Sequence, residues 1–144
     1  MALATTQAQT APASAERQTV ERFVRALAER DQQAALALYE PAADWEVHVP
    51  GGDGLQHGVG EIGELLRPWF TGRDGFEVAR YQLVDQGESV ALRWELHWRD
   101  ELDGAPCVSH QSHFFDVRNG RIHRHWLYCS GVRVVQPEHR HAGS

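Results

Sequence analysis

The chain has 144 residues, of which 42% are hydrophobic and 24% charged, and its formal net charge is −6. This length suits one domain with a sizeable core. The chain is acidic and has no basic stretch, which argues against nucleic acid as a partner. No apolar run approaches the ~20 residues that cross a bilayer. Two cysteines are too few to form a disulfide framework. We therefore expect a cytoplasmic globular domain with no nucleic-acid or membrane partner.

The two ends of the chain differ from its middle. Residues 1–14 are small, polar and aperiodic, and residues 136–144 have the same character. Such segments cannot bury enough apolar surface to become ordered. The sequence predicts a disordered segment over 1–14, a single domain over 15–135 and a flexible tail over 136–144.

Three helices are predicted in the first half of the domain. Ser14 is placed to cap a helix whose apolar residues recur at helical spacing. Asp31 is placed to cap a short second helix that runs through Tyr39, because Pro41 prevents its continuation. A third amphipathic helix is predicted over 62–70.

The remaining elements are predicted strands with period-two alternation, the clearest over residues 90–98. A first strand covers 45–49 and ends in the loop 50–54, and Asn119-Gly120 marks a hairpin between the last two strands. The predicted order is two helices, a strand, a third helix and then a run of strands. This order predicts an α+β fold, with a largely antiparallel sheet curved around the helices. The further strands are predicted over residues 76–84, 107–117 and 121–129.

Four segments carry a family resemblance: residues 38–41 (LYEP), 45–51 (WEVHVPG), 58–62 (GVGEI) and 113–122 (HFFDVRNGRI). In this order and spacing they resemble the nuclear-transport-factor-2-like superfamily, and within it the SnoaL-like branch of polyketide cyclases, which has ketosteroid isomerases as relatives. The resemblance implies a cone-shaped α+β fold, in which a curved antiparallel sheet wraps around three N-terminal helices. It also implies a deep pocket and a homodimer joined through the outer sheet faces.

A pair of polar residues on the strand 107–117 is the first candidate for chemistry. Alternation places Gln111 and His113 on one face of this strand, although hydropathy does not say which face is inside. SnoaL-like cyclases carry a Gln-x-His element that points into the pocket, and Gln111-Ser112-His113 matches it. The resemblance implies that His113 moves a proton or donates a hydrogen bond while Gln111 holds a substrate oxygen. Alternatively, both are satisfied polar residues of the core.

The last strand departs from the family pattern. Strand pairing in related folds places His123, His125, Leu127 and Cys129 towards the cavity, so His125 is a third catalytic candidate near His113. The cyclases resembled here have an aspartate as their principal acid/base group where this chain has Leu127. A leucine cannot transfer protons, so their aldol-type mechanism is not expected. Val49 likewise stands where ketosteroid isomerases carry their base.

Aromatic side chains dominate the predicted pocket, and flat indoles suit a rigid polyene or fused-ring ligand. A metal site built from His113, His123 and His125 lacks supporting carboxylates, so no metal and no cofactor is expected. The predicted substrate-binding residues are Trp45, Trp69, Leu92, Trp94, Trp98, Phe115 and Leu127, with Tyr39 and Phe23 supplied by the helices.

These features favour an enzyme that cyclises a hydrophobic polyketide-type intermediate of antibiotic biosynthesis. Either His113 moves a proton next to a carbonyl, or the pocket folds a polyene for a pericyclic, [4+2]-like closure; Leu127 favours the second route. Two alternatives stay open: a proton-transfer isomerase or hydratase of the ketosteroid type that uses His48 or His113, and a non-catalytic small-molecule binding module. The loop 99–106 is expected at the cavity mouth.

Overall fold

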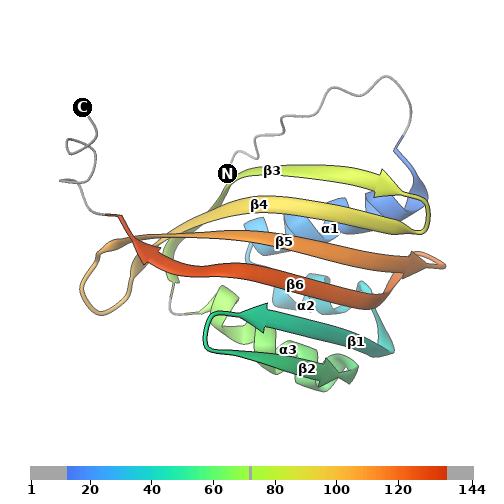
Figure 1. The fold of residues 1–144 in the computed structure, drawn as a ribbon, viewed down its shortest axis with the longest axis horizontal. Coiled ribbons are helices and arrows are strands. Elements are labelled where there is room, and N and C mark those ends of the chain that lie inside the picture. Colours follow the sequence, from blue (N-terminus) through green and yellow to red (C-terminus); the bar gives the residue numbers. More distant parts are fainter. Residues whose placement is uncertain (1–12, 72, 136–144) are drawn as a thin grey trace.

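The computed structural model describes residues 13–71 and 73–135, so the predictions for 1–12 and 136–144 concern positions outside the described residues. Its strands form one sheet in the order β2-β1-β6-β5-β4-β3 (Figure 1). The elements are α1 (Ala15–Ala28), α2 (Gln32–Leu36), β1 (Tyr39–Val49), β2 (Gly52–His57), α3 (Gly58–Phe70), β3 (Arg73–Gln86), β4 (Ser89–Asp100), β5 (Pro106–Arg118) and β6 (Arg121–Val134).

Both predicted helix caps are confirmed. The Ser14 hydroxyl accepts a hydrogen bond from the Arg17 backbone N–H at 3.0 Å, and the Asp31 carboxylate accepts one from the Ala34 N–H at 3.0 Å. These contacts satisfy N–H groups that have no partner within a helix. The second helix is shorter than predicted, because β1 already begins at Tyr39.

The sheet is largely antiparallel, as the sequence predicted, and it also contains a parallel pair that was not predicted. β1 runs parallel to β6, and its register with β6 shifts between Tyr39 and Asp44. This irregularity accommodates Pro41 within a strand, since proline cannot donate a ladder hydrogen bond. The other neighbouring strands are antiparallel.

The segment after Pro50 is a strand and not the predicted loop. Gly51 adopts a φ of 97°, which a residue with a side chain rarely takes, and the backbone reverses there. β2 then pairs with β1 from Val49 opposite Gly52 to Asp44 opposite His57. The hairpin widens the sheet at this edge and gives α3 a surface to cover.

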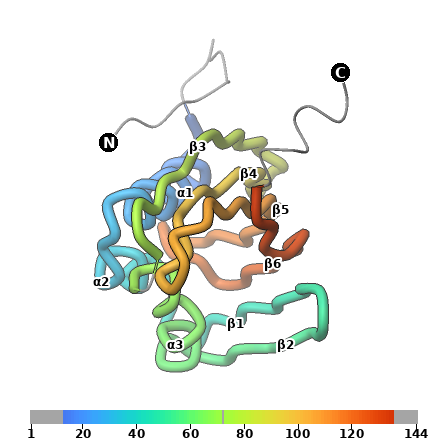
Figure 2. The backbone as a smooth tube through the Cα atoms, turned by 90° about the vertical axis from the view of Figure 1, so that its left-hand side faces the viewer, coloured from blue at the N-terminus to red at the C-terminus, as the bar shows by residue number. Residues whose placement is uncertain are grey.

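The helices lie on the concave side of the sheet, α1 over β3 to β5 and α3 over β1 and β2 (Figure 2). The predicted α+β fold is therefore confirmed, with its core between helices and sheet. No helix of the described residues is long and apolar enough to cross a membrane.

Strand β6 does not keep one alternation along its length. Ile122 and His125 are both buried, because the register with β5 shifts between Asp116 and Val117. The grouping of His123 with His125 on the cavity side was therefore wrong. His123 faces outward, and its Nδ1 lies 3.6 Å from a carboxylate oxygen of Glu40.

Candidate functional site

Five buried side chains form a hydrogen-bonded network in the interior, which we call the polar network. The Tyr39 hydroxyl lies 2.8 Å from His125 Nδ1, and His125 Nε2 lies 2.7 Å from His113 Nδ1. His113 Nε2 lies 2.9 Å from Gln111 Oε1, to which the Trp94 indole N–H also donates at 2.8 Å. The structure thus brings together Gln111, His113 and His125, the three predicted catalytic residues.

Each member of the polar network is placed by strand register. Gln111 and His113 are two residues apart on β5, so they share the inward face. Trp94 on β4 stands opposite Gln111. Tyr39 belongs to β1 and not to a helix as predicted, and the parallel pairing of β1 with β6 places it near His125.

The donor and the acceptor of each hydrogen bond in the polar network can be assigned, starting from the Trp94 indole. An indole N–H can only donate, so the atom of Gln111 that faces Trp94 is the carbonyl oxygen. His113 Nε2 must then carry a proton to bond to that same oxygen. Burial lowers the pKa of His113 to about 3, so the ring is neutral near pH 7 and its Nδ1 accepts.

The tautomer of His113 also fixes the hydrogen bonds at the far end of the polar network. His125 donates from Nε2 to His113, and its pKa is lowered well below the ordinary value, by burial first and by neighbouring His113 second. Its Nδ1 therefore accepts from the Tyr39 hydroxyl, whose own pKa is raised by burial. The network is neutral and polarised in one direction, from Tyr39 to Gln111.

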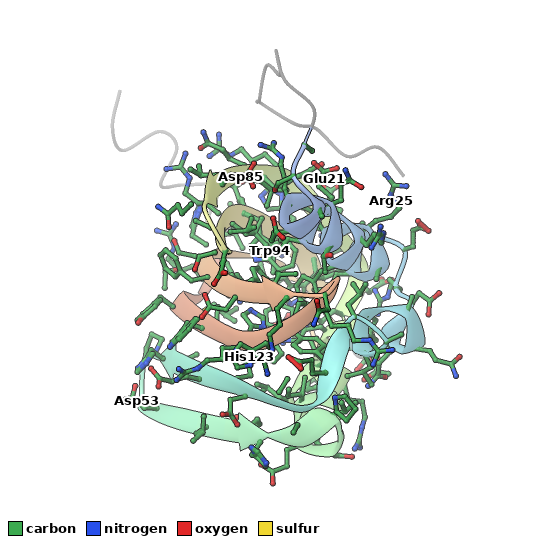
Figure 3. The ribbon with its side chains drawn as sticks, turned by 90° about the vertical axis from the view of Figure 1, so that its right-hand side faces the viewer. Glu21, Arg25, Asp53, Asp85, Trp94 and His123 are labelled. Atoms are coloured by element: carbon green, nitrogen blue, oxygen red, sulfur yellow. The ribbon has the colours of Figure 1, made fainter. Side chains whose placement is uncertain are left out.

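Aromatic rings enclose the polar network. The His125 ring lies between Trp45 and Phe115, with both ring centroids 4.1 Å away. Phe23 of α1 stacks on Trp94 at 6.0 Å, and Trp94 lies beside this helix in Figure 3. Trp45 Nε1 is buried and has no hydrogen-bond partner among residues 13–71 and 73–135.

Leucines flank the imidazole of His113. Leu92 on β4 and Leu127 on β6 stand opposite His113 on either side, and both are buried. Leu127 thus lies next to the histidine, at the position where the family resemblance implies an aspartate. No carboxylate is available there to orient or charge the imidazole.

At its other end, the polar network contacts the Cys129 thiol, which was not among the predicted site residues. Gln111 Nε2 lies 3.5 Å from Cys129 Sγ, the Gly131 N–H donates to the same sulfur at 3.3 Å, and Ser109 Oγ lies 3.3 Å from it. The family resemblance implied that Cys129 faces the cavity, and Ser109 shares the face of Gln111 on β5, but only the register between β5 and β6 brings the two together.

Trp69 and Trp98 form a separate cluster. Their ring centroids are 6.3 Å apart, and the Arg73 guanidinium carbon lies 4.3 Å from the first ring and 4.6 Å from the second. Arg73 was not predicted to belong to a site, because nothing in its local sequence signals this cation–π contact. These two predicted substrate-binding residues therefore pack on an arginine and not on the polar network.

Two cavities of the molecule reach the Trp94–Gln111 end of the polar network, and His113, His125 and Tyr39 line neither of them. One of about 350 Å³ is lined by Trp94 together with Arg80 and His110, and one of about 330 Å³ by Gln111 and Cys129 together with Tyr128. A third, of about 480 Å³, lies between Arg73 and the loop that follows β4. The predicted lining side chains instead contact one another, so the deep pocket stays a prediction.

The remaining histidines considered for chemistry lie outside the interior. His48 is bonded to Glu46 at 2.8 Å, and the Nδ1 of His110 lies 3.7 Å from Glu95. Among the residues that the structure describes, no three His, Cys, Asp or Glu side chains are grouped so as to hold a metal ion.

Comparison with known proteins is consistent with this geometry. A candidate polyketide cyclase from Silicibacter sp. TM1040 superposes with a TM-score of 0.70, at 15% identity over 81% of this chain and 89% of that chain. SalBIII, an epoxide hydrolase/cyclase-like enzyme in pyran ring formation of salinomycin, superposes with a TM-score of 0.68, at 18% identity over 83% of this chain and 95% of that chain. TerC, co-crystallised with polyporic acid, superposes with a TM-score of 0.67, at 20% identity over 80% of this chain and 91% of that chain.

No curated protein sequence matches the chain. At these identities the solved structures establish the fold, which is NTF2-like. The family follows from the sequence, since the model of the SnoaL-like domain matches residues 20–125, most of the chain. The protein therefore belongs to the SnoaL-like family.

Proposed function

We propose that this protein is a cofactor-independent enzyme that closes a ring in a hydrophobic polyketide-type intermediate of antibiotic biosynthesis. The observation that carries this proposal is the interior, where one neutral polar network is enclosed by aromatic rings. Membership of the SnoaL-like family supports it, as does the fold shared with cyclases and isomerases. A hydrophobic, uncharged substrate suits such an environment.

The state of His113 favours ring closure by shape over proton abstraction. A general base works best when its pKa lies near the working pH, whereas burial lowers the pKa of His113 to about 3. Its Nδ1 lone pair is also occupied by His125. Leu127, which stands opposite His113, supplies no proton-transfer group.

A pericyclic closure needs no such base. In a [4+2] closure two π bonds are replaced by two carbon–carbon σ bonds, and no proton is gained or lost. Holding a flexible polyene in the reactive conformation can remove several kcal/mol of the barrier. Closure of the indane ring of indanomycin is one reaction of this class, although no motif of this chain singles it out.

The experiment is turnover of an acyclic polyene that carries a diene and an enone, followed in H₂O and in D₂O. We expect the protein to accelerate ring closure over buffer, with no deuterium in the product next to the carbonyl. Leu127→Trp, which fills the interior, should abolish turnover, whereas Val84→Trp on the exposed side of β3 should not. Deuterium incorporation that is lost in His113→Gln would contradict this mechanism and support a proton-transfer isomerase.

A non-catalytic binding module is the second candidate. It is supported by proteins of the same fold that were crystallised with small molecules, TerC with polyporic acid and a protein from Catenulispora acidiphila with trimethylamine. Saturable binding of the polyene without any acceleration of its closure would support this alternative.

A further inference from the structure

We propose that the indole N–H of Trp45 binds the carbonyl oxygen of a neutral ligand in the interior of the domain. This inference rests on the proposed function and deepens it, because it names the group by which the substrate is held. Trp45 is 1% exposed, and no other buried side-chain nitrogen or oxygen within residues 13–71 and 73–135 lacks a hydrogen-bond partner. A buried donor without a partner is costly, and native proteins keep few of them.

The nearest ring, that of His125, cannot accept a hydrogen bond from the Trp45 indole N–H. The His125 ring is stacked on the indole at 4.1 Å with an interplanar angle of 14°, so its in-plane nitrogens do not face the indole edge. Both of these nitrogens are already bonded, one to Tyr39 and the other to His113. The indole N–H is therefore left for a group that the protein itself does not supply.

The other buried donors of the site are engaged. Trp94 and His113 both donate to the carbonyl oxygen of Gln111, and the amide nitrogen of Gln111 is directed at Cys129. A ligand oxygen could reach those donors only by breaking the polar network. Trp45 is the donor that it can use without such a cost.

The surroundings specify a neutral acceptor. The buried polar residues among those described include no Asp, Glu or Lys, and the buried Arg17 is paired with Glu21 on α1. A charged ligand group would lose its hydration here without gaining a counter-ion. A ketone, ester or enone carbonyl accepts a hydrogen bond while remaining uncharged.

A carbonyl held in this way would also be activated. A hydrogen bond to the oxygen of an enone withdraws electron density from the attached alkene, which lowers the barrier to ring closure onto it. Trp45 would thus decide which double bond of a polyene reacts. Because the surrounding rings are in contact, binding requires them to rearrange, so the experiment measures binding as well as the role of the donor.

The test uses two probes, α-tetralone and tetralin, which share a fused-ring skeleton and differ in one carbonyl. Their dissociation constants are measured by calorimetry for the wild-type protein, for Trp45→Phe and for the control Trp126→Phe. Trp126 lies beside Arg124 on the other face of β6, at 5.1 Å, and is a matched indole outside the interior. In wild-type protein, the Trp45 indole proton is followed by NMR and is assigned through its nuclear Overhauser contacts with the stacked His125 ring.

We expect Trp45→Phe to reduce the preference for the ketone over the hydrocarbon by about three- to tenfold, the effect of one hydrogen bond. Trp126→Phe should leave that preference unchanged. Tetralone, but not tetralin, should shift the Trp45 indole proton downfield in wild-type protein, and this readout serves even if Trp45→Phe does not fold.

Two results would overturn the inference, and they are distinguishable. If both probes bind but the preference and the indole shift show no dependence on the carbonyl, Trp45 is not the donor and the proposed function survives. If neither probe binds wild-type protein, the assignment of Trp45 as a carbonyl-binding donor fails, whereas the proposed function is decided separately by turnover of the acyclic polyene.

Discussion

The Trp94 indole nitrogen lies 2.8 Å from Oε1 of Gln111, and this contact sets the direction of the entire polar network. Because the indole only donates, it fixes the orientation of the Gln111 amide. That orientation fixes the tautomer of His113, which in turn fixes the tautomer of His125 and the hydroxyl of Tyr39. A residue that carries no catalytic group of its own thereby controls the protonation pattern of the candidate site.

Gln111→Leu tests this dependence. The substitution leaves the Trp94 N–H and the His113 Nε2–H buried without an acceptor, and each orphaned donor costs about 1–3 kcal/mol. We expect urea denaturation to show a loss of at least about 2 kcal/mol in the free energy of unfolding. The control Gln82→Leu, at a partly exposed position of β3, should change it by less than about 0.5 kcal/mol.

A double-mutant cycle separates the orphaned donor from lost packing. Trp94→Phe removes one of the two donors, so the double variant Trp94→Phe/Gln111→Leu should lose less stability than the two single variants added together. Strict additivity would show that the contact between Trp94 and Gln111 does not organise the network.

The stability of the fold should fall as the pH falls below about 6.5. The pKa of His113 is lowered from 6.5 to about 3 by burial, so the unfolded chain takes up a proton that the folded chain refuses. The contribution of His113 is complete above pH 6.5 and is lost as the pH falls towards 3, at about 1.4 kcal/mol per pH unit. His125, whose pKa is also lowered, acts in the same direction.

The comparison with His113→Gln isolates this effect. Glutamine retains a donor and an acceptor but does not titrate, so between pH 6 and 4 the slope should be shallower by about 1.4 kcal/mol per pH unit. Hydrogen bonds to Glu46 and Asp44 raise the pKa values of His48 and His57 respectively, so these two residues change stability only above about pH 6.5, and they contribute equally to the two proteins. Denaturation curves with identical slopes would mean that His113 is not held neutral.

Gly131 tests the contact between the turn after β1 and a second irregularity of β6, where the register with β5 shifts between Ser109 and Gln111. It adopts a φ of 92°, and a Cβ there would lie 3.1 Å from Cγ of Pro50. Gly87 also has a positive φ, 72°, but a Cβ there would meet nothing within 4 Å. We expect Gly131→Ala to lower the thermal midpoint more than Gly87→Ala does, by an amount that reports the Pro50 contact; equal shifts would contradict this.

The outer face of the sheet is the predicted dimer surface. Phe114 and Tyr128 are 37% and 46% exposed, and their rings meet edge to face at 6.0 Å across β5 and β6. We expect a homodimer in size-exclusion chromatography with light scattering, and a monomer for Tyr128→Glu, because a buried carboxylate would oppose association. Leu102→Glu, at a 97% exposed loop position, should stay dimeric. A monomeric wild-type protein would refute this interface.

Local patterns in the sequence determined much of this protein. The two helix caps, the alternation of β4 and the shared face of Gln111 and His113 all follow from interactions within a few residues, because capping and strand periodicity are local. The family resemblance then supplied the direction in which that face points.

Only the tertiary structure decided how distant segments meet. The parallel pairing of β1 with β6 brings Tyr39 and Trp45 to His125, and the shift of register against β5 turns His123 outward. Likewise, Arg73 lies against two indoles that are far apart in the sequence, Trp69 and Trp98. Strand register and strand irregularities arise from contacts between whole elements, and a shift of one residue exchanges the inner and outer faces.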